Sequence, residues 1–303
     1  MSMQGMKATA LAGAVAVGTF ALSALDVTAT TGYRFRVVAS GLARPVGIAV
    51  GGWKTIYFTE IPTPGVSGGA NGVSSLDLDS GAITVLHRGE PEPVNLALSR
   101  DDEVYWTCKS AGVILKMTED GDTVPVLTDL NQPSGISIGK HDAVYFTEVP
   151  SPGVAGANNG VKVFDEGMVK MVSGGEPEPT DVVVNRQGDL YWTCKSAGVI
   201  LTRQKGRISV LVDGLDQPVG IALDKQGRHL YFTEVPTPGV PGTKGGRNRV
   251  SVLDLRSGEI ERIHEGDPEP TDVAVAPNGN VYWTCTVAGV IVEASPTWQR
   301  RRG

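Results

Sequence analysis

The feature that most constrains the fold of this chain is an internal repeat built from two alternating phrases. The first, Tyr-Phe-Thr-Glu, ends at Glu60, Glu148 and Glu234; the second, Tyr-Trp-Thr-Cys, ends at Cys108, Cys194 and Cys285. The pair recurs with a period of about 90 residues, and half of that is the length of a four-stranded propeller blade. Three pairs of phrases therefore predict six blades.

Each half of the repeat is expected to form four short strands. In the fifth, the strands are predicted at 220–223, 229–234, 249–255 and 259–264, separated by turn sequences such as Asp-Lys-Gln-Gly and Arg-Ser-Gly. The 39 glycines and 19 prolines supply the turn residues that so many short strands need. No segment keeps a helical spacing of apolar residues, so the fold class is all-β.

The two ends of the chain complete each other. The sixth half ends after its third strand, near Val292, whereas residues 34–42 match the pattern of the fourth strand at 208–215. A strand from the N-terminus would therefore complete the last blade and remove the open edges that a linear stack leaves. The sequence predicts a closed six-bladed β-propeller with pseudo-threefold symmetry of paired blades.

The first 29 residues are interpreted separately. An apolar stretch from Ala8 to Leu25 follows Lys7, and Val27-Thr28-Ala29 places small residues where a signal peptidase cuts. We expect 1–29 to be a signal peptide and 30–303 a single secreted, extracytoplasmic propeller domain. A membrane anchor is the alternative for this stretch. The net charge of −6 and the lack of a basic stripe argue against nucleic acid or a further membrane surface as partners, and we expect a monomer.

The repeat phrase resembles a known family. Pro-x-Gly-Ile-Ala, a turn and then Tyr-Phe-Thr-Glu is similar to the repeat of streptogramin (virginiamycin B) lyases, and more loosely to NHL and SMP-30/gluconolactonase propellers. The lyases open a cyclic ester by elimination with a histidine, a glutamate and a divalent metal. In those lyases the catalytic histidine follows a proline ahead of the Phe-Thr-Glu strand. The corresponding positions after the six prolines of this chain hold Val46, Val94, Ser134, Thr180, Val219 and Thr271. The resemblance therefore implies the scaffold, not the lyase reaction, because none of these side chains is a general base.

Two positions around each innermost strand place polar residues at the mouth of the ring. Those before the strand's proline include Arg44, Glu92, Glu178 and Glu269, and those two positions after it include Asn95, Asp181 and Asp272. This set predicts a pocket for a cationic or polyol ligand, with Asn95, Asp181 and Asp272 as ligands for a divalent cation such as Ca²⁺ or Mg²⁺. The alternative is that these side chains cap strand ends and satisfy loop amides.

Spacing limits the other candidates. Neighbouring sheets pack about 10 Å apart and neighbouring strands lie about 4.8 Å apart. Equivalent residues on the second strands of alternate blades are therefore expected to lie on the order of 20 Å from one another. Glu60, Glu148 and Glu234, which with Arg44 are the weak catalytic candidates, cannot then share one ion. For the same reason we expect the three cysteines to be free, buried thiols. His87 and His264 are expected at the surface, on outermost strands.

The sequence supports three hypotheses about function. The first is an extracytoplasmic propeller that binds a small polar or cationic ligand at its mouth, with metal-assisted hydrolase or lyase chemistry of the SMP-30 type as the reaction class that the resemblance implies. The second is a noncatalytic module that binds a protein or a glycan. The third is an isomerase or cyclase that acts by shape complementarity.

Overall fold

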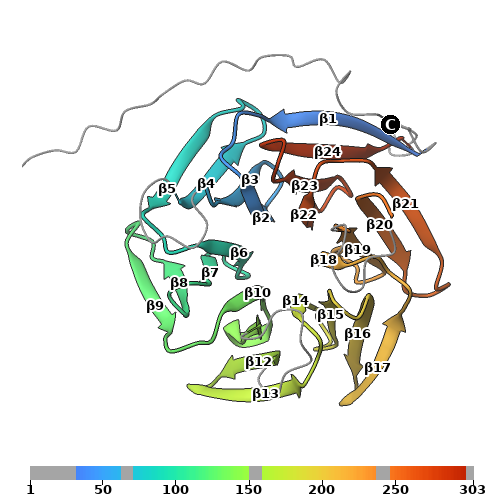
Figure 1. Cartoon of the computed structure of the whole chain (residues 1–303). Helices are drawn as coiled ribbons and strands as arrows, with labels where there is room; N and C mark the ends of the chain where they lie inside the picture. The colour runs from blue at the N-terminus through green and yellow to red at the C-terminus, as the bar shows by residue number, and fades with distance from the viewer. Residues whose placement is uncertain (1–31, 63–70, 150–158, 237–245, 298–303) are drawn as a thin grey trace, which may run out of the picture.

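The protein folds into six four-stranded antiparallel sheets arranged around a central axis (Figure 1). The computed structural model describes residues 32–62, 71–149, 159–236 and 246–297. Within these ranges the only helical element is a 3₁₀ turn, η2, at Lys140–Asp142. The all-β fold and the six blades predicted from the repeat are confirmed.

Five blades consist of four consecutive strands, counted outward from the axis. Blade 1 comprises β2 (Pro45–Gly51), β3 (Thr55–Glu60), β4 (Gly72–Asp77) and β5 (Ile83–Arg88), and blade 2 comprises β6 (Pro93–Leu98), β7 (Val104–Cys108), β8 (Val113–Met117) and β9 (Thr123–Leu127). Blade 3 comprises β10 (Pro133–Ile138), β11 (Val144–Glu148), β12 (Gly160–Asp165) and β13 (Met168–Gly174). Blade 4 comprises β14 (Pro179–Val184), β15 (Leu190–Cys194), β16 (Val199–Gln204) and β17 (Arg207–Val212). Blade 5 comprises β18 (Pro218–Leu223), β19 (His229–Glu234), β20 (Arg249–Asp254) and β21 (Ile260–Glu265).

Blade 6 closes the ring with strands from both ends of the described chain. It consists of β22 (Pro270–Val275), β23 (Val281–Cys285), β24 (Val290–Pro296) and, outermost, β1 (Tyr33–Ala39). Strand β1 pairs antiparallel with β24, with Tyr33 opposite Pro296 and Val37 opposite Val292. The predicted closure is confirmed. The expected signal peptide lies outside the described residues, where its structure is not tested; no helix of the described residues is long and apolar enough to cross a membrane.

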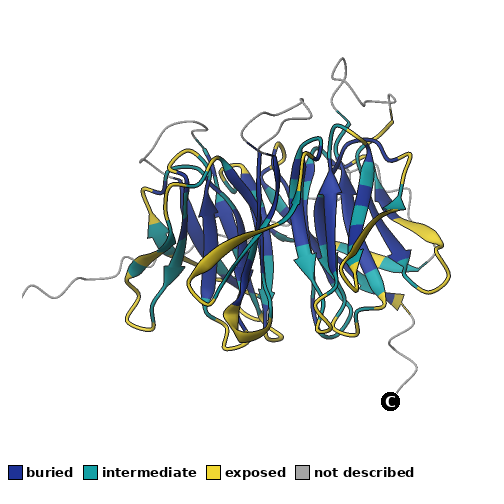
Figure 2. Ribbon diagram, turned by 90° about the horizontal axis from the view of Figure 1, so that it is seen from below, coloured by how far each residue is buried: buried dark blue, intermediate teal, exposed yellow. Residues whose placement is uncertain are grey.

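The core consists of layers between neighbouring blades, and Figure 2 shows the buried residues running along the middle of the strands. The second strands supply its largest side chains. Fully buried tryptophans and phenylalanines of the two repeat phrases are Trp106, Trp192, Trp283, Phe58, Phe146 and Phe232. The three cysteines are free and buried, as predicted. Side chains of one phrase thus pack against the next blade, which is why the repeat needs a closed ring to bury them.

One threonine in every phrase joins its blade to the next. The six residues, all with no exposed area, are Thr59, Thr107, Thr147, Thr193, Thr233 and Thr284. In blade 2, the Thr107 hydroxyl accepts the Asn95 backbone N–H at 3.2 Å and donates to the Ser134 carbonyl of blade 3 at 2.7 Å. The same pair of contacts recurs in the other five blades. A ring of hydrogen bonds therefore fixes the six inner strands around the axis.

Candidate functional site

The chain enters every inner strand through an unusual backbone conformation. The residue before the proline has a positive φ in all six blades, at Arg44 (56°), Glu92 (58°), Gln132 (51°), Glu178 (58°), Gln217 (57°) and Glu269 (55°). Such residues cost conformational energy, so the surrounding structure has to hold them in place. Each carbonyl accepts the N–H of the residue that follows the second strand, for example Lys109 N–H to the Glu92 carbonyl at 3.0 Å.

After each proline the strand bulges, which places the residue two positions later on the axis. In blade 2 the pairing of β6 with β7 shifts register between Pro93 and Leu96. At this level three blades have glycine and the alternate three have Asn95, Asp181 or Asp272. These three side chains are 8%, 5% and 5% exposed, respectively.

The structure brings these three polar side chains together across the axis. Asn95 Nδ2 donates to Asp181 Oδ1 at 2.9 Å, a contact between blades 2 and 4. Asp272 of blade 6 lies close enough to Asp181 for the two charges to interact. Asn95, Asp181 and Asp272, referred to below as the axial cluster, are thus the predicted site residues that lie near one another on the axis, with Asp181 interacting with each of the other two.

The two carboxylates also hold neighbouring blades. Asp181 accepts the N–H of Ile221 in blade 5 at 2.9 Å, and Asp272 accepts the N–H of Ile48 in blade 1 at 2.8 Å. Each accepts a second N–H from the residue that follows it, Val182 or Val273. The capping alternative from the sequence therefore describes part of their role, and convergence on the axis describes the rest.

The alternating glycines allow the inner strands to approach this closely. A β-carbon on Gly135 would stand 2.4 Å from the Asp181 Cα, and one on Gly220 would stand 2.6 Å from the Asp272 Cα. Real β-carbons do not come so near backbone atoms, so any larger residue would force the blades apart. Glycine and acid are thus matched positions on facing strands.

Burial dominates the electrostatics of the axial cluster. It raises the pKa of Asp181 from 3.8 to about 7, partly offset by the N–H groups of Ile221 and Val182. The pKa of Asp272 is also raised well above 3.8, by burial and by the charge of Asp181. No lysine or arginine of the described chain forms an ion pair with either carboxylate. A bound proton or cation would therefore stabilise these two buried carboxylates.

The glutamates of the second strands lie elsewhere and have other partners. Glu60, Glu148 and Glu234 accept the backbone N–H groups of Ala43, Asn131 and Asp216, respectively. Glu148 is also paired with Lys162, and Glu234 lies 4.0 Å from Arg249. Burial raises the pKa of Glu234. These carboxylates fix the loops that lead into inner strands and do not join the axial cluster.

The remaining predicted residues stand at the entrance to the inner strands. Glu92 and Glu178 are half-buried and accept hydrogen bonds from Ser110 and Ser196, respectively. Glu269 is half-buried as well, and Arg44 is exposed. The sequence also predicts long loops rich in glycine and proline after Glu60, Glu148 and Glu234, forming a lobed rim around the mouth. These loops fall on 63–70, 150–158 and 237–245, outside the described residues.

A second set of acids was not singled out from the sequence. Glu90, Glu176 and Asp267, two residues before Glu92, Glu178 and Glu269, are 2%, 7% and 1% exposed. Glu90 accepts the Cys108 thiol at 3.1 Å, and Asp267 accepts Trp283 Nε1 at 2.6 Å. Their recurrence at a fixed distance before each cysteine was the available signal.

These acids also explain a wrong prediction about the histidines. His264 is 3% exposed, not on the surface, because it lies 3.1 Å from Asp267 and stacks near Phe35 and Trp283. His87 pairs in the same way with Glu90 but keeps about a third of its side chain exposed. His264 on β21, the outermost strand of blade 5, is therefore covered by Asp267 in the segment that leads into blade 6.

The three cysteines are buried, and their surroundings favour the protonated thiol. Burial raises the pKa of Cys194 to about 12, with the charge of Glu176 adding to the effect. The pKa values of Cys108 and Cys285 are raised for the same two reasons, with Glu90 and Asp267 as the respective neighbours. A thiol that stays protonated acts as a packing group and a weak donor, not as a catalyst or metal ligand.

Comparison with known proteins supports the fold. No family model matches the chain. Solved structures that resemble it include a streptogramin B lyase (18% identity, 88% of this chain and 98% of the other, TM-score 0.62) and a gluconolactonase from Xanthomonas campestris (14%, 87% and 90%, TM-score 0.68). The calcium-binding protein regucalcin from Agrobacterium tumefaciens is also similar (16%, 87% and 94%, TM-score 0.67).

A curated relative from Pyricularia oryzae has a different description. It is a low-density lipoprotein receptor-related protein 1, which is 26% identical over 290 residues and covers 80% of this chain and 89% of that protein. At these identities the likenesses show that the chain shares the propeller architecture of lyases, gluconolactonases and regucalcin. They support the resemblance drawn from the repeat phrase.

Proposed function

We propose that this protein is an extracytoplasmic propeller that holds a divalent cation, Ca²⁺ or Mg²⁺, in the axial cluster and binds a small polar or cationic ligand at the mouth beside it. One observation carries the proposal: two buried carboxylates converge with an amide on the axis, and no lysine or arginine among the described residues forms an ion pair with them. Burying unpaired charge is costly unless a proton or a metal neutralises it.

The donor set fits a hard cation. Asp181 and Asp272 supply carboxylate oxygens, a ligand type that Ca²⁺ and Mg²⁺ prefer. Asn95 donates its NH2 group to Asp181, and its oxygen accepts the Leu96 N–H at 2.6 Å, so its amide would have to turn to bind the cation through oxygen. Asp181 Oδ2 and both Asp272 oxygens each accept one backbone N–H and keep a second lone pair, whereas Asp181 Oδ1 already accepts both Val182 N–H and Asn95 Nδ2. No group of three or more His, Cys, Asp and Glu side chains in the described ranges could hold a metal, so water would complete the coordination.

The reaction class rests on the structural neighbours. Two of them are described as a streptogramin B lyase and a gluconolactonase, and a third as a calcium-binding protein. A bound cation would supply a Lewis acid that polarises a ligand carbonyl. We therefore propose metal-assisted hydrolysis or elimination as the reaction class, with Arg44, Glu92, Glu178 and Glu269 contacting the ligand around the mouth.

A noncatalytic binding module is the second candidate, and a specific observation favours it. Glu60, Glu148 and Glu234 are occupied with loop N–H groups, and Glu148 has a lysine partner as well. That leaves them no role as a free general base. On this hypothesis the exposed or half-buried groups at the entrance recognise a partner without transforming it.

Calorimetric titration of Ca²⁺ and Mg²⁺ into metal-stripped protein tests the proposal. Asn95→Asp adds a third carboxylate and should strengthen cation binding at least tenfold, whereas Asp272→Asn should weaken it by a similar factor. Asp254→Asn, at the C-terminal end of β20 and away from the axis, is the matched control and should leave affinity unchanged. Equal affinity in all four proteins, or no binding by any, would refute the cation site.

A further inference from the structure

Blade 6, where β1 pairs with β24, differs from the other five blades at one buried position on β24. The residue opposite the tyrosine of the second strand differs in character from blade to blade: Ser75, Lys116, Val163, Thr202, Val252 and, in blade 6, Glu293. Glu293 is thus the only acid among the six, and it is 2% exposed. It lies on β24, directly opposite Arg36 of β1.

Glu293 is the centre of a network of polar side chains, referred to below as the floor. Its carboxylate pairs with Arg36 and accepts hydrogen bonds from Ser295 Oγ at 3.0 Å, Tyr282 OH at 3.3 Å and Asn280 Nδ2. The Asn280 backbone N–H is held in turn by Asn278 Oδ1 at 3.0 Å. With this many donors, the glutamate is fully used inside the protein and fixes the side chains around it.

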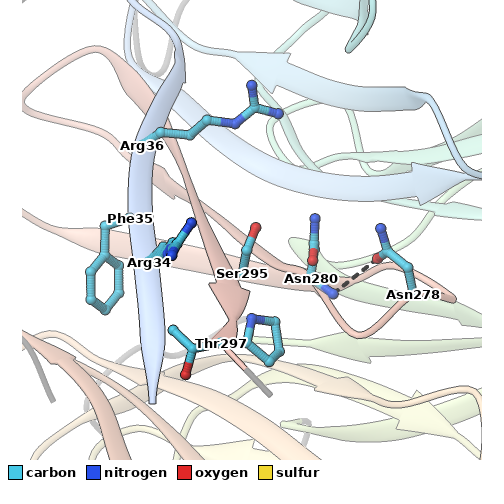
Figure 3. A pocket seen from close by; sticks show the side chains of 8 residues that line it. Arg34, Phe35, Arg36, Asn278, Asn280, Ser295 and Thr297 are labelled. Atoms are coloured by element: carbon cyan, nitrogen blue, oxygen red, sulfur yellow. Dashed lines mark hydrogen bonds between the residues drawn. The ribbon is translucent and has the colours of Figure 1, made fainter. Parts of the chain in front are cut away.

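A hollow of about 510 Å³ opens above this floor, at the end of the propeller where first and second strands are joined. It is lined by Arg34, Arg36, Asn278, Asn280, Ser295 and Thr297, together with Phe35 and Pro296. Figure 3 shows Arg34 and Arg36 on the same side of β1, towards Ser295 and Asn280, while Phe35 points to the other side. The hollow is separate from the axial cluster, which lies on inner strands.

The charges in the hollow favour one anionic group. Glu293 neutralises Arg36, but Arg34 is exposed and makes no hydrogen bond or ion pair with any described residue. A free guanidinium binds a carboxylate or a sulfate through two parallel hydrogen bonds. The hollow therefore offers one unused positive charge in a chain whose net charge is −6.

The other lining groups suit hydroxyls. Within the protein, Asn280 Nδ2 and Ser295 Oγ donate to Glu293, and the Thr297 hydroxyl donates to the Gly32 carbonyl. The Asn280 amide oxygen and the hydroxyl oxygens of Ser295 and Thr297 can still accept hydrogen bonds from sugar hydroxyls. Pro296 adds an apolar surface for the C–H face of a ring. A volume of about 510 Å³ is in the usual range for a small-molecule site.

We propose that this hollow binds an acidic saccharide, a sugar ring with one carboxylate or sulfate group, and that Arg34 holds the anionic group. The site does not depend on the cation proposed for the axis. Its specificity comes from Glu293, which positions Arg36, Asn280 and Ser295 to meet the sugar hydroxyls.

Ligand-observed NMR titrations test this proposal with four probes: glucuronate, glucose 6-sulfate, glucose and acetate. Glucuronate, the sulfate ester or both should bind at least tenfold more tightly than glucose and acetate, and whichever binds identifies the anionic group. Arg34→Gln should weaken that binding at least tenfold, and Arg34→Lys should weaken it less, because lysine keeps the charge without the fork.

Arg207 of blade 4 provides the matched control. It lies opposite Gln204 at the position that Arg34 occupies opposite Ser295, and it is exposed. Arg207→Gln and the axial variant Asp272→Asn should both leave saccharide binding unchanged. Equal binding by wild type and Arg34→Gln, binding of glucose or acetate as strong as that of the acidic sugars, or no binding by any probe would overturn the proposal.

Discussion

Ionisation of the axial cluster should make the protein less stable as the pH rises from about 4 to about 7. Burial raises the pKa of Asp181 from 3.8 to about 7, so in this range the folded state keeps a proton that the unfolded state releases. The free energy of unfolding falls with rising pH over any range in which the folded state binds more protons than the unfolded state. Asp272, whose pKa is raised by burial and by the charge of Asp181, adds to the effect in the same direction.

The expected size follows from the pKa of Asp181. Each pH unit over which one proton is bound only in the folded state contributes about 1.4 kcal/mol. From an ordinary value of 3.8 to about 7, the free energy of unfolding should fall by on the order of 4 kcal/mol. A cation in the axial cluster would oppose this loss, so the measurement requires a chelator.

Urea denaturation at pH 5, 6, 7 and 8, with EDTA present, measures this dependence. In Asp181→Asn the fall attributable to this carboxyl should disappear. Its absolute stability should also change by about 1–3 kcal/mol, because the Ile221 N–H loses its acceptor, and the slope with pH is therefore the informative quantity.

Asp77→Asn is the control for this experiment. Hydrogen bonds from the Ser80 backbone N–H and hydroxyl and from the Asp79 N–H lower the pKa of Asp77, so its contribution to stability is lost only as the pH falls below the ordinary range of a carboxyl. That variant should therefore keep the wild-type slope between pH 5 and 8. If Asp181→Asn also keeps the wild-type slope, or if wild-type stability rises over this range, the argument from the buried axial carboxylates is refuted.

Three further predictions concern the fold. In urea denaturation, Thr107→Val should lower the free energy of unfolding by about 2–4 kcal/mol, because it leaves the buried Asn95 N–H and Ser134 carbonyl without their partner. The control Thr84→Val, on the exposed face of β5, should change it by less than about 0.5 kcal/mol, and similar losses in both variants would contradict a bridging role for Thr107. Titration with a thiol reagent should detect three thiols in denaturant and far fewer in native protein, and a mass showing a disulfide would contradict the blade register. Deleting residues 33–42 should remove the outer strand of blade 6 and cause aggregation or a large drop in melting temperature, and a monomeric variant with an unchanged melting temperature would contradict closure by β1.

The sequence by itself determined the architecture. Repeated phrases of fixed length, turn residues between short apolar runs and a last unit without its fourth strand were sufficient to predict six blades closed by residues near Arg34. This works because strand period and turn chemistry are local properties, and a repeat multiplies a weak local signal six times. The same spacing placed the cysteines too far apart to form a disulfide.

Only the tertiary structure decided which polar residues meet. The sequence set Asn95, Asp181 and Asp272 apart from Glu92, Glu178 and Glu269 as candidate cation ligands, but it left open whether they only cap strand ends. The bulge after each proline turns the first set to the axis, where Asn95 contacts Asp181, and leaves the second set at the entrance. His264 was placed wrongly for a related reason, because its burial depends on a loop of the neighbouring blade. Contacts between blades depend on how far apart the strands are in space, and positions along one chain do not record that distance.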